Sequence, residues 1–171
     1  MADVPALQSL IARSVRSLSS GFYTPVQVEA AISAVFGVDT QLIADRTYYL
    51  IVESDETVAA GGWSSRRTLY GGDQMKAAED PRLDPASEAA RIRAFFVHPD
   101  RARRGLARRL YGECARAAYA AGFRRFELMA TLPGEPLYAA LGFAPVERIA
   151  LTMAPGVELP LVKMARRIDK V

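Results

Sequence analysis

The chain has 171 residues, of which 50% are hydrophobic and 24% charged, and its net charge is +3. These values are typical of one soluble globular domain, here residues 1–171. We expect no membrane span, because the longest purely aliphatic and aromatic run is Tyr48–Val52. We also expect no signal peptide, since the N-terminus has no basic segment followed by an apolar one, and no internal disulfide, since Cys114 is the lone cysteine. A cytoplasmic protein that does not bind membranes is therefore predicted.

Helices and a hairpin are predicted for the first third of the chain. Apolar residues recur at helical spacing over 4–19. A Thr-Pro pair, typical of a helix start, predicts a second helix over 25–36, and a short helical turn is expected at 39–44. Residues 47–53 and 57–64 are rich in β-forming side chains around a short turn, so they predict a β-hairpin.

Strands and helices alternate after a long polar loop over 66–88. A loop of this length inside a compact domain is usually functional or disordered. The first element predicted after it is a strand over 91–97, whose apolar core suggests burial on both faces. A helix over 105–121 follows, with an inward face made of Leu106, Leu110, Cys114, Ala117 and Ala118. The remaining elements are a strand over 125–131, a short helix over 136–141, a strand over 143–153 and a last strand to about Arg166.

Positive charge is concentrated in the middle of this second part. Ten arginines lie between Arg91 and Arg125 against two acids, so this segment has a charge of +8 and the remainder −5. Such segregation usually serves an anionic partner. A general preference for Arg explains its use instead of Lys, but it does not explain the clustering.

The segment V-H-P-D-R-A-R-R-G-L-A-R-R-L, residues 97–110, places Gly105 where the long helix begins. The first turn of a helix has unpaired backbone N–H groups and the positive end of the dipole. A bare glycine turn there lets an anion approach. A solvated basic helix start is the alternative, and the residues alone leave the two open. The pattern is neither a Walker loop nor a dinucleotide fingerprint.

Three motifs in order resemble the GNAT superfamily of N-acetyltransferases, which bind acetyl-coenzyme A. They are F-F-V-H-P-D at 95–100, R-R-G-L-A at 103–107 and P-L-Y-A-A-L-G-F at 136–143. The resemblance implies an α/β (α+β) fold: a mixed, twisted sheet flanked by helices, in which two parallel strands, 92–97 and 126–129, splay apart. It also implies direct transfer of the acetyl group to an amine, without an acyl-enzyme.

By this resemblance, the pantetheine arm pairs with the first splayed strand and the pyrophosphate binds the start of the long helix. The implied binding residues are Phe95, Phe96, Val97, Arg103, Arg104, Gly105, Leu106, Ala107, Arg108 and Thr131. Three features depart from the family pattern. Ala102 replaces the usual Gln or Arg, so Arg101, Arg103 or Arg104 would supply the charge; Thr131 replaces a common Asn; and the family's first strand is expected to be missing.

The family position of a tyrosine near the acetyl-CoA sulfur is Tyr138, and a phenol there can protonate the departing thiolate. The alternative is an aromatic ring that packs the short helix on the sheet. For His98, the only histidine, we expect no catalytic role, and for Cys114 a place in the core. Glu88 is a weak candidate for the general base. The alternatives are a water chain that takes the proton, or an amine that is already neutral.

Candidates for the acceptor pocket are the aromatic residues Tyr23, Trp63 and Tyr70 and the loop 66–88, although ordinary core packing explains each aromatic residue equally well. The acidic residues of the loop could attract a cationic amine or merely keep the loop soluble; they are Asp73, Glu79, Asp80 and Asp84.

The predicted function is acetyl transfer from acetyl-CoA, with no metal, to a primary amine of a small molecule or peptide. The alternative is a non-catalytic acyl-CoA-binding or regulatory module on the same fold. We expect no nucleic-acid partner, because the basic patch lies at one helix start without interleaved exposed aromatic residues. A homodimer is also allowed for.

Overall fold

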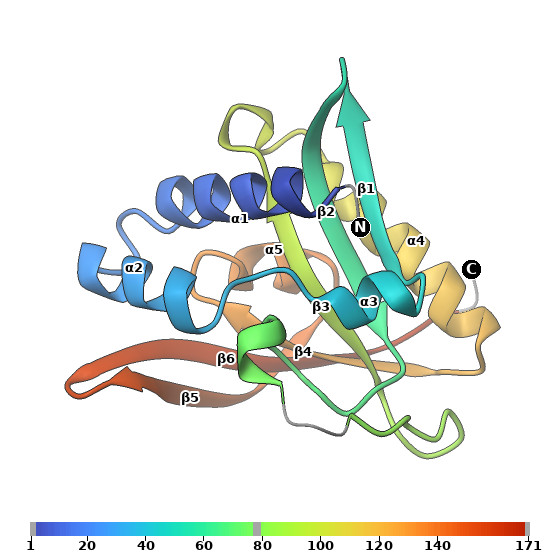
Figure 1. Ribbon diagram of the computed structural model, residues 1–171. Helices are drawn as coiled ribbons and strands as arrows, with labels where there is room; N and C mark the ends of the chain where they lie inside the picture. The colour runs from blue at the N-terminus through green and yellow to red at the C-terminus, as the bar shows by residue number, and fades with distance from the viewer. Residues whose placement is uncertain (1–2, 77–79, 170–171) are drawn as a thin grey trace.

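The computed structural model describes residues 3–76 and 80–169 and contains a six-stranded sheet (Figure 1). Neighbouring strands are antiparallel except β3 and β4, which are parallel. The order across the sheet is β1 (Tyr48–Glu53), β2 (Glu56–Ser64), β3 (Ala90–Val97), β4 (Arg125–Thr131), β6 (Val157–Arg167) and β5 (Ala144–Ala154).

Helices cover both faces of the sheet. The helices α1 (Val4–Leu18), α2 (Pro25–Ala34) and α3 (Thr40–Ala44) lie in front of it in Figure 1, while α4 (Leu106–Ala120) lies behind, and α5 (Glu135–Ala140) packs into the same core as α4. Two short 3₁₀ turns flank β3 along the chain: η1 (Asp73–Met75) lies before it and η2 (Pro99–Arg101) after it. No helix in the described residues is long and apolar enough to cross a membrane.

The expected mixed, twisted sheet flanked by helices is confirmed, and the predicted helices and strands match the observed ones to within a few residues. The first described element is α1, and a missing first strand stays a prediction. The inward face of α4 was partly wrong: Tyr111 and Ala115 are buried as well, whereas Ala117 is only half-buried. The aromatic ring of Tyr111 fills space beside Phe126 and Phe143.

The two parallel strands splay apart. Only two residue pairs join β3 to β4, Ala90 with Phe126 and Arg91 with Glu127, and the second pair also forms a side-chain ion pair. From there β4 stays paired with β6 along all seven of its residues, while β3 stays paired with β2. The sheet therefore opens between its third and fourth strands, as the family resemblance implied.

A bulge in β3 shapes the edge of this opening. Gly61 of β2 stands opposite two residues of β3, Ala94 and Phe95, and Ala94 has a positive φ of 54°. A Cβ atom on Gly61 would lie 2.7 Å from the Phe95 ring, so only glycine fits. Tyr48 fixes the bulge by donating its hydroxyl hydrogen to the Ala94 carbonyl at 3.2 Å. After the bulge, Phe95 and Phe96 point to opposite faces of the sheet, as neighbours in a strand do.

The expectation that β3 is buried on both faces holds only before the bulge. Residues 94–97 are half-buried because they border the opening. The buried part contains a charge, since Arg93 is only 3% exposed. Its guanidinium pairs with Asp39, itself 1% exposed, at 2.8 Å.

This buried ion pair anchors the loop between β2 and β3. Arg93 also donates to the carbonyls of Thr68 at 2.7 Å and Gly71 at 2.6 Å. Asp39 caps α3 through two backbone N–H groups and also pairs with Lys76. Burial lowers the pKa of the Arg93 guanidinium, and the Asp39 carboxylate opposes that effect. Five groups of the loop and α3 therefore converge on one pair of charges.

Asp39→Asn keeps the shape of the side chain but leaves Arg93 buried without a counter-charge. Removing one member of a buried pair costs about 3–5 kcal/mol, so the free energy of unfolding measured in urea should fall by that amount. Glu29→Gln, which removes the exposed partner of Arg16, is the control and should leave the melting temperature nearly unchanged. A loss below about 1 kcal/mol in Asp39→Asn would contradict the anchoring role.

Candidate functional site

A cavity of about 230 Å³ occupies the opening between β3 and β4 and is lined from both faces of the sheet. On the α4 face its walls include Phe95, Ala107 and Tyr138. On the α1 face they include Ser14 and Phe96. Because the sheet is unpaired here, the cavity passes through it and connects its two sides.

Six of the predicted site residues line this cavity, and the others lie at the adjacent start of α4. The six are Phe95, Phe96, Val97, Ala107, Thr131 and Tyr138. The remaining predicted residues are Arg103, Arg104, Gly105, Leu106 and Arg108, of which Leu106 is buried beneath the helix start and the others are exposed.

The start of α4 is open to an anion. Gly105 is the N-cap residue with a positive φ of 80°, no side chain among the described residues caps the helix, and nothing lies within 4 Å of a Cβ atom built on Gly105. Arg103, Arg104, Arg108 and Arg109 are exposed, and within residues 3–76 and 80–169 they form no ion pair. Unpaired cations beside bare helical N–H groups are a combination that binds phosphate.

One of the arginines expected to compensate for Ala102 is used elsewhere. Arg101 pairs with Glu53 at the end of β1 at 3.1 Å. Its charge is therefore partly neutralised, which leaves Arg103 and Arg104 as the candidates at this loop. Arg103 adopts a positive φ of 65° and is exposed.

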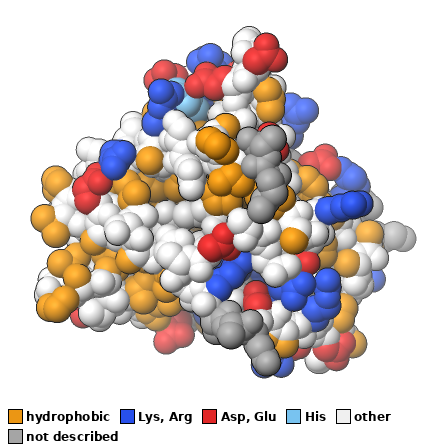
Figure 2. All heavy atoms as spheres, in the orientation of Figure 1, with side chains coloured by type: hydrophobic (Ala, Val, Ile, Leu, Met, Phe, Trp, Pro, Cys, Tyr) orange, Lys and Arg blue, Asp and Glu red, His pale blue; other side chains and the backbone are white. Residues whose placement is uncertain are grey.

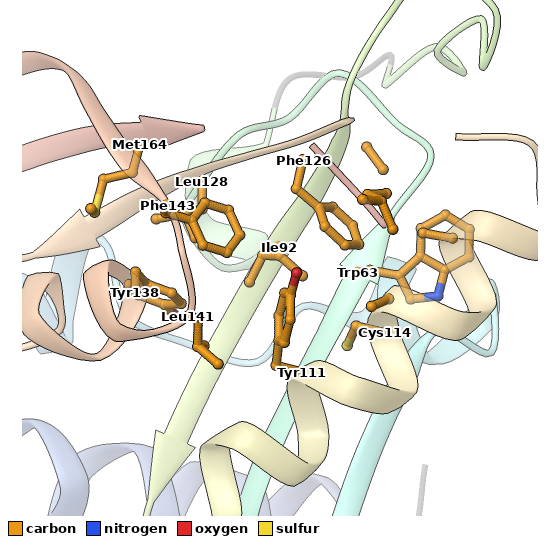
Figure 3. Packing of buried hydrophobic residues seen from close by; sticks show 14 of the residues in the cluster. Trp63, Ile92, Tyr111, Cys114, Phe126, Leu128, Tyr138, Leu141, Phe143 and Met164 are labelled. Carbon is orange, nitrogen blue, oxygen red and sulfur yellow. The ribbon is translucent and has the colours of Figure 1, made fainter. Parts of the chain in front are cut away.

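Tyr138 is held by aromatic packing and borders the cavity. Its ring meets Phe143 and Phe95 edge-on, with centroids 5.8 and 6.3 Å away, and Figure 3 shows it beside Phe143, far from Trp63 in the same cluster. Burial raises the pKa of the phenol, so the hydroxyl keeps its proton through the neutral range and can donate it. Both of its expected roles, packing and bordering the reaction space, are compatible with this position.

Cys114 lies in the core, as expected. It is fully buried on α4 and points into the cluster drawn in Figure 3. Burial raises the pKa of its thiol, which disfavours the thiolate that a nucleophile would need.

His98 and Glu88 hold loops and do not line the cavity. His98 accepts a hydrogen bond from the Asp100 backbone N–H at Nδ1, 3.2 Å away, and its Nε2 lies 3.1 Å from Arg13. Glu88 accepts from the Asp84 N–H at 2.8 Å. Neither is placed to take a proton from an amine in the cavity.

Of the three aromatic candidates for the acceptor pocket, only Tyr70 lines the cavity, together with its neighbours in the loop. Trp63 is a core residue that packs edge-on against Phe123 with centroids 6.0 Å apart. Tyr23 is buried and acts as a clamp: its hydroxyl donates to the Pro160 carbonyl at 2.7 Å and accepts from the Leu132 N–H at 2.9 Å. It thereby holds the chain where β4 ends, directly after Thr131.

The described acidic residues of the loop accept hydrogen bonds from backbone N–H groups of the loop and of α3. Asp73 accepts from the Thr40 N–H at 3.0 Å, Asp80 from the Thr68 N–H at 2.8 Å, and Asp84 from the Ala86 N–H at 3.0 Å. None of the three lines the cavity. The expectation that they attract a cationic amine is not supported by these positions, and Glu79 lies outside the described residues.

Sequence reasoning missed many of the residues that line the cavity, among them Ser14 and Arg93. Ser14, 5% exposed, accepts a hydrogen bond from the Val97 N–H at 3.2 Å, which satisfies part of the unpaired edge of β3. Its signal was a hydroxyl on the apolar face of the first helix. Arg93 borders the cavity beside the loop, and its signal was a charge inside an apolar strand. Among the described residues, no cluster of His, Cys, Asp and Glu could hold a metal ion.

Comparisons with known proteins agree on one family. The sequence matches the acetyltransferase (GNAT) family over residues 13–143. No curated protein sequence matches the chain at a significant level.

Solved structures share the fold at low sequence identity. A GCN5-related N-acetyltransferase from Rhodopseudomonas palustris has a TM-score of 0.71 and 16% identity, with 97% of this chain and 90% of that one covered. The PaiA N-acetyltransferase from Thermoplasma acidophilum, solved with coenzyme A, has a TM-score of 0.64, 10% identity and coverages of 97% and 93%. YncA from Salmonella typhimurium, a putative acetyltransferase solved with acetyl-CoA, has a TM-score of 0.63 and 15% identity, with 99% of this chain and 91% of that one covered.

Tyr23→Phe removes the clamp and leaves the Pro160 carbonyl and the Leu132 N–H without their partner. The expected loss is about 1–3 kcal/mol in the free energy of unfolding, measured in urea at neutral pH. The control is Tyr119→Phe, since no hydrogen bond of the Tyr119 hydroxyl occurs in the described residues; this change should be nearly neutral.

The same variant should also change the response to alkali. Burial raises the pKa of Tyr23 to about 12, above the value of about 10 expected in the unfolded chain. The folded state therefore binds more protons between these values, and stability falls as pH rises from about 10 through 12. The fall should be smaller in Tyr23→Phe, and equal slopes in the two proteins would contradict the assignment.

Proposed function

Because the chain belongs to the acetyltransferase (GNAT) family, we propose that it transfers an acetyl group from acetyl-CoA to the nitrogen of a primary amine. Acetyl transfer is the family's activity, and the amine nitrogen as acceptor is the further step. The single observation that carries it is the cavity through the sheet, which joins an open helix start to Tyr138 on one face and to a separate space on the other.

The residues present fit a coenzyme A molecule. The unpaired edge of β3 offers backbone groups to an extended chain in the way that an added strand would. The bare start of α4 and the exposed Arg103, Arg104 and Arg108 offer donors to a pyrophosphate. The PaiA and YncA structures hold coenzyme A and acetyl-CoA, respectively, on the same fold, which supports the same ligand here.

The two substrates are expected to enter from opposite faces. The open helix start lies on the α4 face, so coenzyme A would approach from there and reach the cavity past Ala107. The acceptor would then enter from the α1 face, between α1 and the loop that Arg93 anchors. The thioester and the amine would meet at the level of the sheet, near Phe96 and Tyr138.

The bound thioester supplies an activated acetyl group, and the protein residues manage the proton. The acceptor nitrogen attacks the carbonyl carbon, forming a C–N bond as the C–S bond breaks. Tyr138 donates its hydroxyl proton to the departing sulfur, and the proton lost by the acylated nitrogen restores the phenol. The balance is one amine and one thioester giving one amide and one thiol.

Release of free thiol from acetyl-CoA in the presence of amines, amino acids, polyamines and peptides tests this function. The proposal expects thiol release that depends on the acceptor and forms one amide for each thiol. A protein that binds coenzyme A tightly but releases no thiol with any acceptor would instead be a binding module. A cytoplasmic location and a homodimer stay predictions.

Gly105→Glu should abolish coenzyme A binding, because it adds bulk and a negative charge where the pyrophosphate is proposed to bind. Isothermal titration of coenzyme A measures the effect. Gly105→Gln is the matched control: it has the same size and the same strain at a φ of 80°, so it should lose less affinity. Unchanged affinity in Gly105→Glu would place the pyrophosphate elsewhere.

Tyr138→Phe keeps the ring that packs on Phe143 and removes only the proton donor. We expect kcat to fall by about 10²–10⁴-fold while the KM for acetyl-CoA changes little, since the proton is needed only as the thiolate leaves. Steady-state kinetics with a saturating acceptor measure both constants. Because burial raises the pKa of this phenol, wild-type kcat should show no alkaline decline from Tyr138 below about pH 10. Activity within a few-fold of wild type in Tyr138→Phe, with chemistry limiting the rate, would exclude this role.

A further inference from the structure

The part of the cavity on the α1 face, which the proposed function assigns to the acceptor, is mainly apolar. We call it the acceptor chamber. Its apolar walls come from α1, the α2–α3 connection, the β2–β3 loop and β4; they are Val15, Leu18, Val35, Phe36, Leu69 and Met129. Figure 2 shows hydrophobic side chains gathered over the α1–α2 end of this face, with charged ones along the upper edge and at the lower right. Leu18, 36% exposed, stands where the chamber meets the surface.

No negative charge faces this chamber from the described residues. Arg93 is the only charged residue among the described ones that line the cavity, and Asp39 already balances its charge at 2.8 Å. Asp39, the acid that pairs with Arg93, is 1% exposed and also binds Lys76. Asp73 is also occupied, by the Thr40 N–H and by Lys76 at 3.4 Å. Among the described residues, an ammonium group in the chamber would therefore meet an apolar wall and find no free counter-ion.

The chamber is also rigid on its loop side. The Gly72 N–H donates to the Val35 carbonyl at 2.9 Å, and the Asp73 N–H donates to the Val38 carbonyl at 3.0 Å. A Cβ atom on Gly72 would lie 2.9 Å from the backbone of Gly37, so the two segments are in direct contact. Together with the bonds from Arg93 to Thr68 and Gly71, these contacts fix the wall. The described part of the loop is therefore tied to the α2–α3 connection and to Arg93.

We propose that the acceptor is a small amine with an apolar body and a single amino group, and that the chamber binds it in its neutral form. This inference rests on the proposed function. Burial in an apolar space without a free counter-ion disfavours an ammonium ion, so the amine loses its proton to solvent as it enters. The nitrogen then has a free electron pair for attack, and no carboxylate base is required. Polyamines and other polycationic acceptors are excluded by the same feature.

Proton release on binding tests the neutral form directly, without catalysis. The probe is hexylamine, titrated calorimetrically at neutral pH into the enzyme saturated with coenzyme A, in two buffers of different ionisation enthalpy. Hexylamine is almost fully protonated in solution at this pH, so the inference expects about one proton released for each amine bound. Binding with no proton release would mean that the ammonium ion is accepted, and the inference would be wrong.

A matched pair of substrates tests the exclusion of a second charge. Hexylamine and 1,5-diaminopentane have the same number of heavy atoms and differ in the terminal group, which is CH₃ or NH₃⁺. Burying an unpaired ammonium costs well over a kilocalorie, so kcat/KM should be at least about tenfold higher for hexylamine. Equal or faster turnover of the diamine would overturn the inference and leave the proposed function intact. Acetyl-CoA that stays intact with every amine would overturn the proposed function, and the inference with it.

Leu18 allows the chamber to be changed without burying a new charge deeply, because its side chain is partly exposed. Leu18→Asp supplies the missing carboxylate, and Leu18→Asn is the uncharged control of the same shape. The ratio of kcat/KM for the diamine over hexylamine should rise at least about tenfold in Leu18→Asp relative to Leu18→Asn. The same ratio in both variants would mean that charge in the chamber does not select the acceptor.

Discussion

Pairing between β3 and β4 ends after two residue pairs, and the site exists because of this early end. Each strand is held by its other neighbours: β4 pairs with β6 along its full length, and β3 pairs with β2 around the bulge at Ala94. Tyr48, Ser14 and Tyr23 then hold backbone groups near the opening that the missing pairing would otherwise leave free or misplaced. Since unpaired backbone groups are costly when buried, an opened sheet needs such partners or a ligand that replaces them.

The buried Arg93–Asp39 pair gives the opening a fixed wall on one side. Taking two charges out of water is expensive, and a pair of this kind is weak support for overall stability. Here its contribution is positional, because Arg93 uses its remaining donors on the carbonyls of Thr68 and Gly71 and so sets the path of the loop. Arg93 also lines the cavity. One residue therefore shapes the acceptor chamber and binds the carboxylate of Asp39.

The sequence predicted most of the fold, because helix periodicity, helix caps and turn residues are local signals. The motif around Gly105 and the position of Tyr138 could also be predicted, since a bare glycine turn and an ordered set of motifs are visible in the sequence itself. The bulge at Ala94 could not be predicted, because no glycine or proline marks it and its partner Gly61 lies in another strand. Asp39 and Arg93 are 54 positions apart, so their pairing depends on the fold. For the same reason, sequence alone could not separate Tyr70, which lines the cavity, from Trp63, which is in the core.

The central claim is that the opening between β3 and β4 is the channel in which the acetyl donor and the acceptor meet. A crystal structure of the protein with coenzyme A tests it most directly. We predict the pantetheine arm between residues 95–97 and 129–131, the pyrophosphate at the start of α4, and the sulfur within hydrogen-bonding distance of the Tyr138 hydroxyl. We also predict an unchanged Arg93–Asp39 pair beside an unfilled acceptor chamber. Coenzyme A bound outside the opening, with its sulfur away from Tyr138, would contradict the account.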